Sequence, residues 1–332
     1  EVRPWLAVIS FVNPHDIPFT GGARQMLGFP ELDPDVPDLP AAPSQDDGFT
    51  GRPSSHAQFV QAWAERLFAQ PTDAEYRRFY LWLHRLVDRA IERTVATFEA
   101  RGLLEDTVVV LTSDHGDLLG AHGGLQQKWY NAFDEALHVP LLISGPGIEP
   151  DAHGVDVATS YVDLLPTLLG LVGLDPERLA PELARTHVEV HPPVGRDLSP
   201  ALRNEATAVA EPVYFMTEDQ ISRGLRTTNL LTAEPFRAVQ EPGNVESVVA
   251  ALSVSAGAAA CWWKLNRYYQ HRAGSRGSAS GEGPEEWELH DLTNDPQERH
   301  NLAADPEHET VRSRLVEVLD RVRAERCLTP TV

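Results

Sequence analysis

The sequence predicts an α/β fold, in which a sheet sandwiched by helices is followed by a smaller antiparallel sheet with a packing helix. Three apolar runs, at 5–12, 107–111 and 139–144, are continuous enough to predict strands buried on both faces of a sheet. A long helical pattern lies between the first two runs, and this order favours a parallel crossover. After residue 195 the pattern changes to short strands. We therefore expect a main domain over 1–195 and a small α+β subdomain over 196–332.

The elements of the main domain can be followed in order along the chain. WLAVISFV at 5–12 predicts the first strand, and the Pro-rich stretch 30–53 predicts a loop. Apolar residues recur at helical spacing from Asp73 to Arg101 and Gly102 provides a stop, so a long helix is expected there. TVVVL at 107–111 then predicts a second strand.

The small subdomain carries weaker signals. Short runs separated by Gly, Ser and Pro predict strands at 212–216, 222–231 and 262–269. The low-complexity stretch 271–286 is rich in Gly and Ser, which is typical of a surface loop. A terminal helix is expected at about 308–325.

Composition excludes several classes of protein. The chain has 332 residues, 42% of them hydrophobic, which is enough for a large core. A formal net charge of −21 argues against a nucleic-acid partner, because no basic stripe is present to neutralise phosphates. No apolar run approaches the ~20 residues that a membrane helix needs. Two cysteines do not make a disulfide scaffold.

The stretch TSDHGDLLGAHGGLQQKWY at 112–130 carries the clearest chemistry. It follows a predicted buried strand, so Asp114 and His115 are expected beyond the strand end, where α/β folds place their sites. A carboxylate oxygen and an imidazole nitrogen suit a hard or borderline divalent cation. His122 and Lys128 follow a Gly-rich loop that can bring imidazole and ammonium donors to an anion. Together these groups predict a site for an anionic ester.

This stretch resembles the metal-binding and substrate-binding segment of the sulfatase family, within the alkaline phosphatase superfamily. Three further segments are similar to family motifs, in the expected order: FVNPHDIPF at 11–19, YVDLLPTLLGLVG at 161–173 and ELHDLTNDPQERHNLA at 288–303. The resemblance implies an alkaline-phosphatase-like sheet in the main domain. It also implies a hydrolase that cleaves a sulfate monoester with the help of a metal ion.

The resemblance also implies a role for each candidate site residue. Asp114 and His115 would be metal ligands, typically of Ca²⁺, with Mn²⁺ or another divalent cation left possible by the nitrogen ligand. His15 would contact the sulfate and assist the leaving group, and Lys128 would balance charge on a sulfate oxygen. For His122 two roles stay open: contact with the ester oxygen, or support of the loop.

Two family features are missing from this sequence. Sulfatases carry a first strand with paired aspartates, and then a nucleophile motif C/S-x-P-S-R whose Cys or Ser becomes a formylglycine. Cys261 is followed by Trp262, and Cys327 by Leu328, so neither cysteine fits. We therefore expect that the chain is the C-terminal part of a sulfatase, inactive or nearly so alone. The formylglycine and any leader peptide would belong to the missing segment, which leaves the cellular location open.

The substrate is expected to be a small-molecule or carbohydrate sulfate ester. Two alternatives remain. A phosphonate monoester or phosphodiester hydrolase shares the fold and the Asp-His pair, and a non-catalytic module could keep the fold without the nucleophile. The loops that select a substrate vary within such families, so the sequence does not separate these cases.

Overall fold

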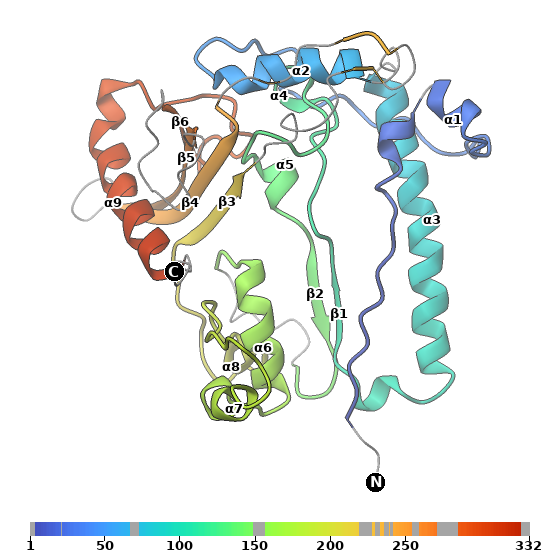
Figure 1. Cartoon of the computed structure of the whole chain (residues 1–332), viewed down its shortest axis with the longest axis vertical. Helices are drawn as coiled ribbons and strands as arrows, with labels where there is room; N and C mark the ends of the chain where they lie inside the picture. The colour runs from blue at the N-terminus through green and yellow to red at the C-terminus, as the bar shows by residue number, and fades with distance from the viewer. Residues whose placement is uncertain are drawn as a thin grey trace.

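The structure is a computed structural model, and it shows a mixed α/β chain, as the sequence predicts (Figure 1). Two sheets are present in the described residues: a two-stranded one in the first half and a four-stranded antiparallel one towards the C-terminus. The residues that the structure describes are 4–20, 22–66, 73–148, 157–218, 228–229, 233–235, 239, 242–253, 259–270 and 285–326.

The expected long helix is confirmed as α3 (Asp73–Glu99). Its first half carries the buried face, because aromatic and leucine side chains recur there at helical spacing and pack on the segments around Ile17 and Val36. Gly102 ends the helix in the left-handed region, at φ 64°, where a residue without a Cβ is favoured. The buried residues of this face are Tyr76, Phe79, Trp82 and Leu83.

Strands β1 (Val109–Thr112) and β2 (Leu141–Ser144) form where two of the apolar runs predict them. They pair with each other in antiparallel register, with Val109 opposite Ser144. The prediction that they are buried on both faces is wrong for the described chain, because Leu142 is 62% exposed. An apolar run identifies a strand but does not show what covers it.

The expected strand at 5–12 is not formed within the described residues, and neither is the parallel crossover that depended on it. The segment is exposed, with Leu6 82% and Val8 85% accessible. Figure 1 shows it as an extended trace starting near the lower end of α3, where the Trp5 ring lies 5.7 Å from the Phe98 ring. A strand requires hydrogen bonds from a neighbouring backbone, and no described segment supplies them here.

Shorter helices surround these elements. One of them, α6 (Leu164–Leu171), lies within the segment 161–173 that resembles a family motif. The buried Asp163 anchors it: its Oδ2 accepts from the Ser160 amide at 3.1 Å and from the Arg196 guanidinium at 2.6 Å. The other short helices are α1 (Gly22–Met26), α2 (Ser54–Arg66), α4 (Ala121–Gly124), α5 (Asp134–Leu137), α7 (Pro176–Leu183) and α8 (Ser199–Leu202). Single 3-10 turns occur at Ile17–Phe19, Leu104–Asp106, Tyr161–Asp163 and Pro306–His308.

The C-terminal part contains an antiparallel sheet with a helix, which confirms this feature of the predicted fold. Strands follow the order β3 (Val213–Glu218), β4 (Asn244–Ser253), β5 (Ala260–Tyr269) and β6 (Glu286–Asp291), and α9 (Glu309–Arg326) is the terminal helix. β3, β5 and α9 match expected elements, whereas β4 and β6 were not expected as strands. The expected strand at 222–231 and the expected loop at 271–286 lie almost entirely outside the described residues. The boundary at 195 stays a prediction.

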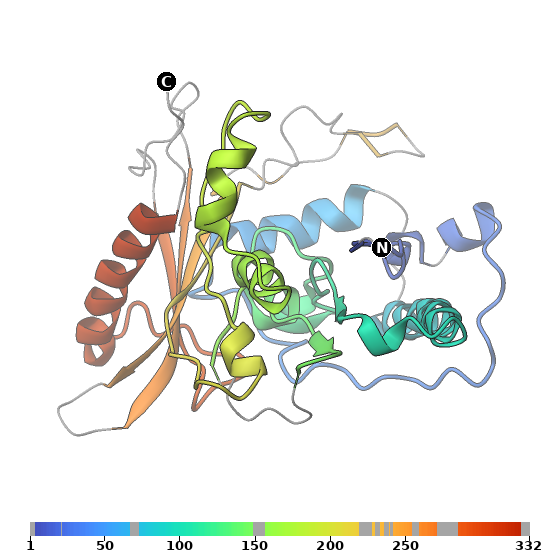
Figure 2. The ribbon, with the colours of Figure 1, turned by 90° about the horizontal axis from the view of Figure 1, so that it is seen from below.

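The two faces of this sheet differ in character. Figure 2 shows α9 on one face and the rest of the described chain on the other. The α9 face is mainly apolar, with Leu265 and Leu289 packed on Leu315 and Leu319. The opposite face carries buried polar side chains: Ser247, Lys264, Asn266, Glu288 and His290. In the described part of the chain, no helix is both long and apolar enough to cross a membrane.

Candidate active site

Asp114 and His115 lie just beyond the end of β1, as the sequence predicts. The Ser113 hydroxyl donates to the His115 carbonyl at 3.0 Å, and the His115 amide donates to Asp114 Oδ1 at 3.0 Å. His115 Nδ1 lies 2.8 Å from the Gly116 carbonyl, which can only accept, so the ring proton belongs on Nδ1. The lone pair of Nε2 is therefore directed outward. Asp114 Oδ2 lies 3.5 Å from that nitrogen, on a side chain that is 85% exposed.

Lys128 comes back to the same place from thirteen residues further along the chain. Its ammonium donates to His115 Nε2. The same ammonium lies 5.2 Å from the centre of the Trp129 ring, within range of a cation–π contact. Asp114, His115 and Lys128 therefore form one group, in which a carboxylate, an imidazole acceptor and an ammonium are adjacent.

A buried carboxylate holds the loop in the shape that returns Lys128. Asp117 Oδ1 accepts from the Leu119 amide at 2.9 Å and from the Gln127 amide at 3.3 Å, which ties the two ends of the loop together. The Tyr76 hydroxyl, on α3, donates to Asp117 Oδ2 at 2.9 Å. Burial raises the pKa of the Asp117 carboxyl, although these hydrogen bonds act in the opposite direction.

The structure places His122 apart from the Asp114 group, with its own side chain fully buried. Its ring stacks on Phe133 with centroids 3.7 Å apart, and its Nε2 lies 3.1 Å from both carboxylate oxygens of Glu135. A nitrogen of Arg52 approaches Nδ1 at 3.2 Å; since a guanidinium can only donate, the proton belongs on Nε2. Burial acts to raise the pKa of Glu135, but the hydrogen bond from His122, the backbone hydrogen bond and the nearby positive charge of Lys264 together outweigh it, and the pKa is lowered. Of the two roles left open for His122, this geometry favours support of the loop.

His15 is exposed and lies apart from the Asp114 group in its described contacts. Its amide donates to the Val12 carbonyl at 3.0 Å, in the turn that precedes the Ile17–Phe19 helix. Among the described residues its side chain has no hydrogen-bond or ion-pair partner. Its catalytic role therefore stays a prediction.

The Asp114 and His115 side chains are close enough to bind one cation together, but two ligands are too few for a complete site. Two atoms 3.5 Å apart are close enough to share one ion with ligand distances of about 2.0–2.6 Å. Within the described ranges, however, no group of three or more His, Cys, Asp or Glu side chains could hold a metal ion. Ca²⁺ takes six to eight oxygen ligands, so this pair is only part of such a site.

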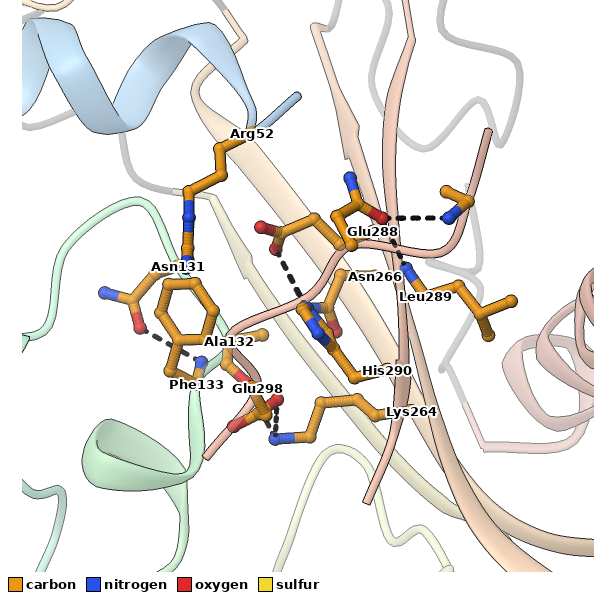
Figure 3. Close-up of polar contacts among 12 residues, drawn as sticks. Arg52, Asn131, Ala132, Phe133, Lys264, Asn266, Glu288, Leu289, His290 and Glu298 are labelled. Carbon is orange, nitrogen blue, oxygen red and sulfur yellow. Dashed lines mark hydrogen bonds and ion pairs between the residues drawn. The ribbon is translucent and has the colours of Figure 1, made fainter. Parts of the chain in front are cut away.

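The C-terminal sheet reaches the segment behind the site, and the sequence did not reveal this. Lys264 on β5 donates to the Ala132 carbonyl at 3.0 Å and pairs with Asp134 and Glu298 (Figure 3). Polar residues at every second position of a strand usually mark a solvated face, so no sequence pattern places Lys264 inside. Its distance along the chain from Asp134, 130 residues, hides the contact from any local pattern.

Comparisons with known proteins identify relatives of this chain. The family model described as Sulfatase matches residues 2–174. A choline-sulfatase of Rhizobium meliloti is 29% identical over 184 residues, which are 54% of this chain and 33% of that protein. A Δ4,5-hexuronate-2-O-sulfatase of Bacteroides thetaiotaomicron is 26% identical over 321 residues, which are 93% of this chain and 54% of that protein. The chain thus spans a third to about half of the length of these relatives.

Solved structures show the same fold. A 2-O GAG sulfatase superposes with a TM-score of 0.60 at 21% identity, over 94% of this chain and 57% of that chain. A phosphonate monoester hydrolase from Silicibacter pomeroyi superposes with a TM-score of 0.56 at 24% identity, over 88% of this chain and 51% of that chain. The alkaline-phosphatase-like architecture predicted from the sequence is therefore confirmed.

Proposed function

Since this chain belongs to the sulfatase family, we propose that the protein hydrolyses a sulfate monoester at the site formed by Asp114, His115 and Lys128. The observation that supports this most is the convergence of Lys128 on the Asp114–His115 pair. This convergence places an ammonium that can bind a sulfate oxygen next to a carboxylate and an imidazole that can bind a divalent cation.

Lys128 is proposed to neutralise a non-bridging oxygen of the sulfate. In the structure its ammonium donates to His115 Nε2, so it must exchange this partner for the sulfate oxygen when the substrate binds. Once it faces the sulfate, an ammonium stabilises the negative charge that develops in the transition state and so lowers the barrier. His15 is proposed to supply the proton for the departing alcohol, a role suited to an imidazole near neutral pH.

Asp114 and His115 are proposed to hold a divalent cation, Ca²⁺ in the first instance and Mn²⁺ as the alternative. Such a cation would polarise the sulfate oxygens as a Lewis acid. The pair offers two ligands, so we infer that further ligands come from outside the described residues. The nucleophile is proposed to be a formylglycine, also contributed from outside residues 1–332.

The substrate is proposed to be a sulfated small molecule or carbohydrate. Relatives named for choline sulfate and for a hexuronate 2-O-sulfate support this class without selecting within it. Hydrolysis of a phosphonate monoester or phosphodiester is the alternative, since a phosphonate monoester hydrolase has the same fold.

The test compares two substrates on the full-length gene product. Purified protein is assayed with an aryl sulfate and with the matching aryl phosphodiester, with and without a chelator. We expect faster hydrolysis of the sulfate and loss of activity after chelation. Preference for the phosphodiester would establish the alternative, and no hydrolysis of either ester by a folded protein would indicate a non-catalytic module.

A further inference from the structure

Lys264 and Glu298 form a buried ion pair at the contact between the C-terminal sheet and the segment behind the active site. Lys264 Nζ lies 2.8 Å from Glu298 Oε1, and both side chains are 1% exposed. Lys264 comes from β5, whereas Glu298 comes from the loop after β6 and has a left-handed backbone, at φ 51°. Burial opposes the charge on Lys264, but the carboxylates of Glu298 and Asp134 raise its pKa and keep it protonated.

The pair binds a short segment of the chain through two backbone groups and one side-chain carboxylate. Lys264 Nζ donates to the Ala132 carbonyl at 3.0 Å and to the Asp134 carboxylate. Glu298 Oε2 accepts from the Asp134 amide at 2.7 Å. Figure 3 shows Lys264 and Glu298 side by side beneath Ala132 and Phe133. The segment 132–134 is thus held by charged groups that come from a different part of the chain.

The next two residues, Glu135 and Ala136, contact Gly116, which follows the end of β1. The Gly116 amide donates to the Ala136 carbonyl at 2.9 Å. The two backbones approach so closely that a Cβ on Gly116 would lie 1.9 Å from the Glu135 carbonyl oxygen. Since Gly116 directly follows His115 and its carbonyl accepts a hydrogen bond from the His115 Nδ1–H, a shift of α5 is expected to move the imidazole to which Lys128 donates.

We propose that Lys264 and Glu298 are positioning residues for the active site, acting through residues 132–136 on Gly116 and His115. The inference rests on the proposed sulfatase activity only for its kinetic effect, because the geometric effect concerns His115 itself. A displacement of about 1 Å remote from the reacting atoms can lower turnover by about 10²-fold, so such a clamp has a measurable consequence.

The test uses two variants of the pair and one matched control in the full-length protein. Lys264→Met removes the ammonium, and Glu298→Gln keeps an oxygen for the Asp134 amide but removes the charge. The control is Glu246→Gln, which alters another buried glutamate of the same sheet. Glu246 pairs with Arg323 of α9, on the opposite face, at 2.8 Å.

Three experiments are carried out on each variant: steady-state kinetics with an aryl sulfate for kcat and KM, thermal unfolding for the midpoint, and NMR of the ¹⁵N-histidine ring signals. The His115 signals are assigned by their loss in His115→Asn. For Lys264→Met we expect kcat to fall by about 10²-fold, and for Glu298→Gln by about 10-fold, with KM little changed. Both variants should shift the His115 ring signals. Glu246→Gln should lower the midpoint but leave the His115 signals in place and kcat within about twofold.

The outcomes separate the two proposals. Unshifted His115 signals in a folded Lys264→Met protein would overturn the positioning role. The positioning role would also be overturned if, in all three variants, kcat fell in proportion to the decrease in thermal midpoint. If Lys264→Met does not fold, Glu298→Gln decides the question with the same readouts. If the unmodified protein hydrolyses no sulfate ester, the proposed function fails, while the NMR comparison still decides whether the pair positions His115.

Discussion

Within the described part of the chain, the Lys128 ammonium contacts the His115 imidazole and lies over the face of the Trp129 ring. We expect Lys128→Ala in the full-length protein to lower kcat for an aryl sulfate by about 10²–10³-fold, as for the loss of one preorganised donor to a developing oxyanion. Steady-state kinetics measure the effect, and an unchanged thermal midpoint serves as the control. An unaltered kcat would place Lys128 outside the reaction.

The Asp114–His115 pair makes a prediction about metal affinity. Two ligands are far fewer than the six to eight that Ca²⁺ takes, so residues 1–332 alone should bind Ca²⁺ with a Kd above about 10⁻⁴ M. Isothermal titration calorimetry measures this, with Asp114→Asn as the control that removes one ligand charge. Tight binding that survives Asp114→Asn would move the metal site elsewhere.

His56 makes the stability of the chain sensitive to mild acid. It is fully buried between Phe133 and Tyr268, each with a ring centroid 5.4 Å away, and burial lowers its pKa to about 4 from the ordinary 6.5. Between these values the unfolded chain binds a proton that the folded chain does not. Stability is therefore fully present above about pH 6.5 and falls as the pH decreases to about 4, by about 3 kcal/mol in total.

Urea unfolding at a series of pH values measures this decline, with His56→Gln as the comparison. The substituted protein should be less stable at neutral pH but should have a flatter profile between about pH 6.5 and 4.5. Carboxylates with lowered pKa, such as Glu288, lose their contribution at lower pH, below about 4.5. An identical slope in both proteins would show that His56 is not the responsible group.

At the scale of elements, Gly116, which follows β1, packs so closely against α5 that there is no room for a side chain at this position. We expect Gly116→Ala to destabilise the protein by about 1–3 kcal/mol or more, because the added Cβ meets the backbone oxygen of Glu135, which cannot move aside as a flexible side chain would. Gly48→Ala is the matched control, since no atom lies within 4 Å of a Cβ there, and it should stay within about 0.5 kcal/mol. Urea unfolding measures both, and equal effects would contradict the tight approach.

Elements with a strong local pattern could be predicted from the sequence, and others could not. α3 and α9 have long helical patterns, and β1 and β2 coincide with apolar runs. β4 was missed because Glu246 and Ser247 interrupt its apolar pattern, although both are buried by partners from other elements. The strand expected at 5–12 has the right composition but no described neighbour, since pairing is a property of two segments and not of one.

The candidate site divides in the same way. Asp114, His115 and Lys128 lie within one short stretch, so a sequence motif was enough to predict that they are close together. The support from Lys264 and Glu298 depends on contacts between residues more than a hundred positions apart, which no local periodicity encodes. Glu135 supports the same region of the chain through its contact with His122.

At the scale of the whole molecule, the described surface exposes large apolar side chains on the segment 5–12 and on β2. Exposed strand-like segments of this kind are templates for pairing with another chain. We expect residues 1–332, expressed alone, to self-associate in a concentration-dependent manner, as measured by sedimentation velocity. Val8→Lys with Leu142→Lys should reduce the association, because charges on such segments oppose pairing. A monomer at every concentration would contradict this expectation.

The contacts of Lys264 and Glu298 with Asp134 also affect when this segment can fold during synthesis of the chain. Asp134 is separated from Lys264 by 130 residues and from Glu298 by 164. At about 5–20 residues per second, a ribosome needs roughly 10–30 s to pass from the first position to the last. During this interval the nascent segment 132–134 exists without the two charged side chains that hold it. The segment 132–134 therefore reaches its final contacts only after Glu298 has been synthesised, and slow translation between these codons would prolong its exposure to proteases.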